Sequence, residues 1–229
     1  MVNGLQKAGG VAALSEAIIY VSAFTFFGAF WNFPVDADDV QKFAFLAEQQ
    51  VILSVVNLIM YVLFGIFLAV LVLALHERLK GHASVLSQIA SVFGVVWVGL
   101  VIASGMIANI GLSAVIDLST NDPEQAMTVW KANSIVVEGL GGGNEVVGGL
   151  WVLLLSIAAI KANELSRLLN FFGLLIGFVG VLTIYPAEVL TEIFGLGQIV
   201  WFAWLGIFIL VKPSKLTRGS SKIVPSNAA

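Results

Sequence analysis

The chain has 229 residues, of which 59% are hydrophobic and only 11% are charged, with a formal net charge of −3. Soluble domains carry about 25% charged residues, so this chain has too few to cover the surface of a water-soluble fold. It contains no cysteine, which excludes disulfides, thiolate metal sites and cysteine nucleophiles. The composition therefore predicts an integral membrane protein.

Six apolar runs follow one another along the chain, separated by short charged gaps. Because lipid-embedded backbone must satisfy its own hydrogen bonds, continuous apolar runs of this length favour helices over barrel strands. The fourth run is short and must extend back through two glutamates to cross a bilayer. We place the helices near residues 11–33, 50–75, 84–112, 134–160, 168–186 and 190–211.

The predicted fold class is thus an all-α membrane protein, a bundle of six transmembrane helices. Residues 1–211 form this domain, and residues 212–229, rich in Ser, Lys and Pro, form a disordered basic cytoplasmic tail. Of the eleven Lys and Arg residues, nine lie at the two ends of the chain and in the second and fourth gaps, and only Lys42 and Lys131 lie elsewhere. Cytoplasmic loops carry the excess of Lys and Arg. Both termini are therefore expected in the cytoplasm, and the protein in the bacterial inner membrane as a multi-pass protein.

The fourth run begins with an unusual segment, Glu138–Gly149, which combines two carboxylates with six glycines. A carboxylate inside a span costs about 2.5–3.5 kcal/mol and normally faces the bundle interior. On a continuous helix Glu138 and Glu145 would share one face, about 10 Å apart, with the glycines forming a cleft beside them. The competing interpretation of the glycines is close helix packing through the small-xxx-small pair Gly139 and Gly143.

Polar side chains from several predicted helices fall at one depth, in the outer half of the membrane. They suggest a ligand pocket that opens outward, for which the candidate residues are Glu145, Glu138, Asn144, Asn57, Asn109, Tyr185 and Gln198. The alternative is that each Asn or Gln holds one helix pair together, a contribution of about 0.6 kcal/mol each. Glu16 is assigned to the cytoplasmic edge of the first span, where it caps the helix or reaches the interface.

The two histidines, His76 and His82, lie six residues apart in a basic loop and are poor metal ligands. They cannot bridge two spans around a haem, and we expect no Ser–His dyad, since both lie in a cytoplasmic loop. No phosphate-binding or dinucleotide-binding glycine motif follows a strand. We predict no metal site, no cofactor, no catalytic residue and no nucleic-acid partner.

Three apolar motifs in the second half have a familiar outline: Glu145-Val-Val-Gly-Gly-Leu-Trp151, Leu169-Asn170-Phe-Phe-Gly173 and Gly197-Gln198-Ile-Val-Trp201-Phe-Ala-Trp204. Over residues 134–211 the chain resembles bacterial six-helix membrane proteins that are catalogued only as a domain of unknown function. The resemblance implies the six-helix fold and brings no substrate or catalytic residue.

The sequence thus predicts a protein in contact with the lipid bilayer that binds, senses or transports a small cationic or amphiphilic ligand. One alternative is an accessory or scaffold subunit whose glycine-rich fourth span packs against a partner membrane protein or a second copy. A third is an intramembrane enzyme that uses Glu138 and Glu145 as acid and base, although no nucleophile, metal set or cofactor motif accompanies them.

Overall fold

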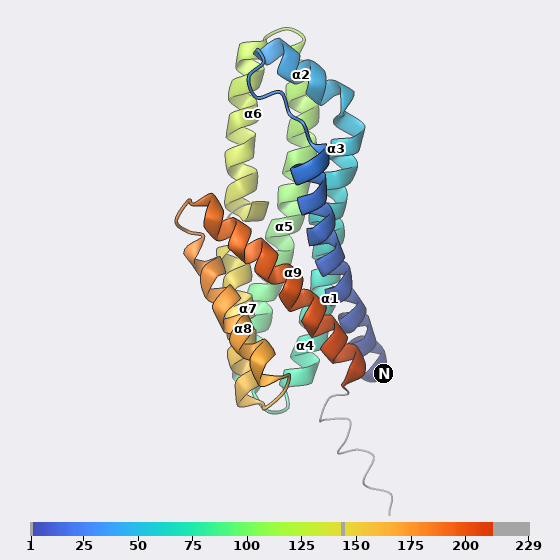
Figure 1. Cartoon of the computed structure of the whole chain (residues 1–229), viewed down its shortest axis with the longest axis vertical. Coiled ribbons are helices and arrows are strands. Elements are labelled where there is room, and N and C mark those ends of the chain that lie inside the picture. Colours follow the sequence, from blue (N-terminus) through green and yellow to red (C-terminus); the bar gives the residue numbers. More distant parts are fainter. Residues whose placement is uncertain (1, 143–144, 213–229) are drawn as a thin grey trace, which may run out of the picture.

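The computed structural model describes residues 2–142 and 145–212, and these are helical almost throughout (Figure 1). Several helices contain a π-helical turn, marked η. In chain order the elements are α1 (Val2–Thr25), η1 (Phe26–Phe30), α2 (Asp39–Glu48), α3 (Gln50–Asn57), η2 (Leu58–Leu63), α4 (Phe64–Leu79), α5 (Ser84–Ser119), α6 (Pro123–Val137), η3 (Glu138–Gly142), α7 (Val146–Lys161), α8 (Arg167–Leu182) and α9 (Glu188–Val211). The predicted all-α class is confirmed, while the predicted tail lies outside the described residues from position 213 on.

Helix length and composition suit a multi-pass membrane protein. Within the described residues, five helical segments are long and apolar enough to cross a membrane: Gly4–Phe30, Gln50–Leu79, Ser84–Ser119, Pro123–Lys161 and Glu188–Val211. The remaining predicted span, the fifth in chain order, corresponds to α8, which is apolar but has 16 residues. Large apolar side chains cover much of the outer surface, and Ile18, Val51 and Leu168 are each exposed by 65% or more. Apolar patches of this extent are typical of a surface that meets lipid or protein.

Several helix boundaries differ from the prediction. The first helix begins at Val2 rather than near residue 11, and α5 continues to Ser119 rather than residue 112. Helix α2 was not predicted, and α6 fills most of a segment expected to be a loop. Each is preceded by an aspartate, Asp38 or Asp122, whose side chain accepts a hydrogen bond from a backbone N–H three residues on. This is the standard stabilisation of a helix start, and it explains why these charged segments are helical.

The long helix α5 joins two packed regions. Its 36 residues extend about 54 Å, well beyond the thickness of a hydrocarbon core. Its first half packs against α4 and α7 in the main core, to which α1, α8 and α9 also contribute, and its second half packs with α2, α3 and α6 around a smaller cluster. Figure 1 shows the second group as an extension of the bundle beyond the turn between α8 and α9.

Glycines on α7 and α8 allow these two helices to pack in close contact. A Cβ atom on Gly149 would lie 2.6 Å from backbone atoms of Gly180, and one on Gly177 would lie 2.7 Å from the backbone of α7. The packing contact predicted for Gly139 is not observed within the chain. A Cβ on Gly139 would meet nothing within 4 Å, and Gly143 lies outside the described residues.

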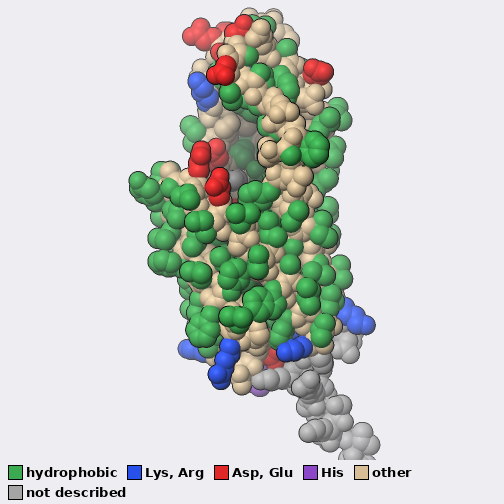
Figure 2. Space-filling model, in the orientation of Figure 1, with side chains coloured by type: hydrophobic (Ala, Val, Ile, Leu, Met, Phe, Trp, Pro, Cys, Tyr) green, Lys and Arg blue, Asp and Glu red, His purple; other side chains and the backbone are tan. Residues whose placement is uncertain are grey.

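Charged residues separate along the bundle (Figure 2). Lys and Arg gather at the end where the chain starts, and Asp and Glu gather at the opposite end and near the start of α9. At the basic end a buried ion pair joins Arg78 of α4 to Glu164, with 3.0 Å between Nε and Oε2. Arg78 also donates to the carbonyl of Lys212 at 3.2 Å. These bonds connect α4 to the α7–α8 turn and to the end of α9.

Candidate functional site

The chain breaks its helical path between α6 and α7. Helix α6 ends at Val137, the π-helical turn η3 follows, and α7 begins at Val146. Gly141 has a φ of 141°, a conformation that glycine adopts without the strain other residues would suffer. The prediction of one continuous helix over 134–160 is therefore wrong. Its consequence, that Glu138 and Glu145 lie two turns apart on one helix face, is wrong as well.

Glu145 immediately precedes α7 and is held there through its backbone. Its N–H donates to the Thr183 hydroxyl at 2.8 Å, and that hydroxyl donates to the Gly180 carbonyl at 2.7 Å. The Glu145 side chain is only 9% exposed, and its Oε2 has no hydrogen-bond partner among the described residues. Buried polar atoms nearly always have a hydrogen-bond partner. The unpaired carboxylate oxygen of Glu145 therefore requires an explanation, such as a bound water or ion.

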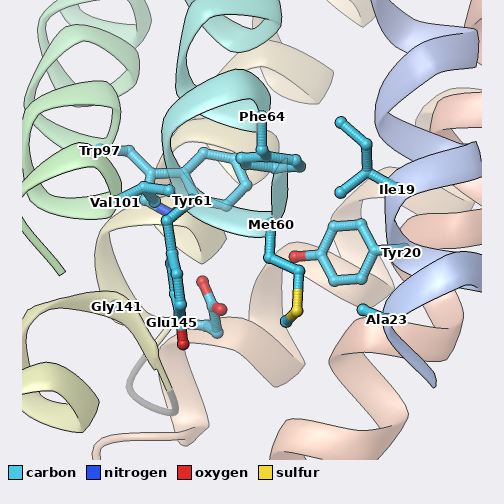
Figure 3. A pocket seen from close by; sticks show the side chains of 10 residues that line it. All are labelled: Ile19, Tyr20, Ala23, Met60, Tyr61, Phe64, Trp97, Val101, Gly141 and Glu145. Carbon is cyan, nitrogen blue, oxygen red and sulfur yellow. The ribbon is translucent and has the colours of Figure 1, made fainter. Parts of the chain in front are cut away.

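The Glu145 side chain borders a cavity of about 100 Å³ between α1, α4, α5 and the start of α7. Figure 3 shows the carboxylate and the Tyr20 hydroxyl both directed into this space. The remaining lining residues are apolar, aromatic or glycine: Ile19, Ala23, Met60, Tyr61, Phe64, Trp97, Val101 and Gly141. Two of the three π-helical turns, η2 and η3, contribute to the lining, and such turns are frequent at functional sites.

Aromatic rings form a continuous cluster around the cavity. Phe64 lies 5.5 Å from Tyr20 and 5.7 Å from Trp97, measured between ring centroids. Trp97 in turn lies 5.6 Å from Trp151, which contacts Trp201 at 5.7 Å. The rings come from α1, α4, α5, α7 and α9. Their contacts connect the cavity wall to the main core. Aromatic faces carry partial negative charge, and here they lie beside a carboxylate.

The other predicted site residues do not line this cavity. The Asn57 amide donates to Asn109 Oδ1 at 3.0 Å, and Asn109 donates to the Ser54 carbonyl at 3.2 Å. This pair joins α3 to α5, as the helix-pairing alternative expected. Glu138 and Tyr185 are exposed. Asn144 lies outside the described residues.

Gln198 is fully buried on α9, and neither amide atom has a hydrogen-bond partner within the described part of the chain. It lies on the same helix face as Gly195 and Phe202, three residues before it and four after it. A Cβ on Gly195 would lie 3.8 Å from the Tyr20 ring, and the Phe202 ring stacks on Tyr20 at 6.2 Å. Gln198 is therefore near the cavity, behind Tyr20.

The sequence analysis missed Glu16, which is 0% exposed and has both carboxylate oxygens unpaired among the described residues. It was assigned to the edge of the membrane because the first helix was expected to start near residue 11. Because α1 starts at Val2, Glu16 lies about 20 Å along the helix, one turn before Tyr20. The sequence feature that could have identified Glu16 is an acidic residue within an apolar run. Its buried position follows from the start of α1 at Val2, which places Glu16 well inside the helix.

One Ser–His contact is present that the sequence analysis did not foresee. The Ser87 hydroxyl lies 3.0 Å from His76 Nδ1 and 3.4 Å from the His76 carbonyl oxygen. Ser87 is 1% exposed, so the contact joins α4 to α5 where no substrate can reach the hydroxyl. Among the described residues, no group of three or more His, Asp or Glu side chains could hold a metal ion.

Comparison of the chain with protein-family models, with curated proteins and with solved structures gives no significant match. Function is therefore inferred from the geometry of the Glu145 cavity. A space bordered by a carboxyl group and aromatic rings can hold a cation, because the carboxyl group, when ionised, supplies the opposite charge and the ring faces add cation–π attraction.

Proposed function

We propose that the chain is a six-span protein of the bacterial inner membrane, with α1–η1, α3–η2–α4, α5, α6–η3–α7, α8 and α9 as its spans. The five long apolar segments and the apolar helix α8 support this number. The concentration of Lys and Arg at one end of the bundle supports an orientation with both termini in the cytoplasm. In this orientation the Glu145 cavity lies about 24 Å above the basic end, since α7 has 16 residues.

Within that membrane domain, the function is to bind a small organic cation from the outer side. The observation that carries the proposal is Glu145, a buried carboxylate with an unpaired oxygen that faces an aromatic cavity. A charge at this depth costs several kcal/mol unless it has a partner. The described part of the spans places no Lys or Arg on the cavity wall, so a cationic ligand is the partner that fits.

The cavity volume limits the size of the cationic group. Its volume of about 100 Å³ is of the same order as an engineered cavity of about 150 Å³ that binds benzene. A methylated ammonium group fits these dimensions. Such groups also shed their hydration shell at low cost, and recognition by aromatic rings is their usual mode of binding.

The alternative roles find less support in the geometry. The scaffold hypothesis relied on glycines of the fourth span, but Gly148 packs against Trp97 and Gly149 packs against α8. Gly148 and Gly149 are therefore covered within the chain, whereas Gly139 is exposed and an added Cβ there would meet nothing within 4 Å. The enzyme hypothesis required Glu138 and Glu145 to act on one substrate, yet Glu138 is exposed and does not line the cavity.

Thermal unfolding of the purified protein in nanodiscs tests the proposal. Tetramethylammonium should raise the melting temperature in a saturable manner, because a ligand that binds the folded state stabilises it by mass action. Sodium chloride at the same ionic strength should not. Glu145→Gln should abolish the shift, since the amide keeps the shape of the side chain and removes its charge.

Glu138→Gln is the matched control, because it makes the same change at an exposed glutamate outside the cavity wall. It should leave the tetramethylammonium shift unchanged. A shift that survives Glu145→Gln, or that disappears equally in both variants, would contradict the assignment of the site to Glu145.

A further inference from the structure

A second, larger space adjoins the Glu145 cavity. This vestibule is a groove open to the outer surface, with a volume of about 420 Å³, between α1–η1 on one side and α3–η2 on the other; Val21, Phe30 and Ile59 on its walls are exposed. It shares the lining residues Ile19, Ala23 and Met60 with the cavity, so the two spaces lie next to each other along α1 and η2. A ligand group held beside Glu145 therefore lies next to the vestibule, with only these three side chains in between.

The vestibule leads away from the cavity toward the acidic end of the bundle. On α1–η1 its lining continues from Ile19 to Phe30, and on the antiparallel partner it continues from Met60 back to Val56. Both directions run from the Tyr20–Phe64 contact toward the end where Asp and Glu gather. Both walls contain a π-helical turn, η1 or η2, which widens the helix locally.

The chemistry of the vestibule differs from that of the cavity. None of its lining residues is charged, and nearly all are aliphatic or aromatic. Of its two hydroxyl residues, Thr25 donates to the carbonyl of Val21 at 2.8 Å and is satisfied within its own helix. A hydrated metal ion gains nothing from such walls, whereas an apolar group gains from leaving water.

We infer that the ligand is an organic monocation with an apolar substituent, whose ammonium head lies beside Glu145 and whose substituent fills the vestibule. The inference rests on the proposed function, because Glu145 fixes the position of the head. The inference narrows the ligand class from small organic cations in general to cations with one apolar substituent, either aromatic or a short alkyl chain. It also gives the ligand a direction, with the substituent pointing to the acidic end.

The test compares two probes that share one charge and one trimethylammonium head. Tetramethylammonium fills only the cavity, whereas benzyltrimethylammonium adds a phenyl group for the vestibule. The dissociation constant of each is measured by isothermal titration on the full-length protein in nanodiscs. The benzyl compound should bind at least about tenfold more tightly, given the apolar area that a phenyl group buries.

Val56→Phe should fill the vestibule and remove this difference while leaving the affinity for tetramethylammonium unchanged. The matched control is Val55→Phe, the same change one residue earlier, on the side of the helix that lines a separate groove near Asn109. This control should retain the difference. Ser22→Leu on the opposite wall repeats the test should Val56→Phe fail to fold.

Equal affinities for the two probes in the wild-type protein would overturn the inference, as would a difference that persists in Val56→Phe and Ser22→Leu. In either case, tetramethylammonium binding that depends on Glu145 would leave the proposed function standing. Binding of the benzyl compound alone, lost in Glu145→Gln and in Val56→Phe, would support both. If neither probe binds, both the inference and the proposed function fail.

Discussion

Replacing Gly149 by alanine should destabilise the protein, because the added methyl group has no space between α7 and α8. Its Cβ would lie 2.6 Å from the backbone carbon of Gly180 and from the nitrogen of Val181, and 2.7 Å from the carbonyl oxygen of Gly177. These are backbone atoms and cannot rotate aside as a flexible side chain would. The two helices must therefore move apart along their whole contact.

The expected magnitude follows from two opposing effects. Overpacking of a tight interface costs about 1–3 kcal/mol, and contact with three backbone atoms of α8 favours the upper end of this range. Alanine in a helix interior is more favourable than glycine by up to about 1 kcal/mol. We expect a net loss of about 2 kcal/mol in the free energy of unfolding, measured by equilibrium unfolding in mixed micelles.

Gly139→Ala is the matched control, since a methyl group there would meet nothing within 4 Å. Its effect should stay within about 0.5 kcal/mol, as for most surface substitutions. The sequence left two interpretations open, a helix contact through Gly139 or a cleft on the side of Glu145, and neither placed Gly149 in a helix contact. A loss at Gly139 equal to that at Gly149, or no loss at Gly149, would refute the packing described for α7 and α8.

Two further predictions concern the basic end and the topology. Arg78→Met should lower the free energy of unfolding by about 3–5 kcal/mol, because it leaves the buried Glu164 without its counter-charge. Adding Glu164→Leu should recover part of that loss, and strictly additive losses in the same unfolding assay would show that the pair is not coupled. For topology, a cysteine at His82 should resist a membrane-impermeant thiol reagent in intact cells, and one at Asp38 should react. The opposite pattern would reverse the proposed orientation; the chain has no native cysteine to interfere.

Hydropathy was sufficient to locate most helices. The expected helices at 50–75, 168–186 and 190–211 correspond to Gln50–Leu79, Arg167–Leu182 and Glu188–Val211. Long apolar runs form helices because a helix satisfies the backbone hydrogen bonds within the run itself. Helices α2 and α6 lack such runs and depend on their caps, Asp38 and Asp122, which a sequence pattern based on hydropathy does not detect.

The candidate site was predictable in part. Glu145 was identified because a carboxylate in an apolar run is costly and normally has a partner or a function. The break at Gly141 was not predicted, since a glycine run is equally compatible with a tight helix contact. Tyr20 and Trp97 were not identified either, because an aromatic residue in an apolar helix resembles ordinary core packing until the helices are placed together.

The most direct test of the central claim is to locate a bound cation by NMR. Intermolecular nuclear Overhauser effects would be measured from the methyl protons of tetramethylammonium to the ring protons of the protein in detergent micelles. The account predicts contacts to Tyr20 and Trp97, since cation–π recognition places the cation within about 6 Å of the ring centroids. These contacts should vanish in Glu145→Gln. Saturable contacts only to exposed aromatic residues such as Tyr185, or contacts that persist without the Glu145 carboxylate, would contradict it.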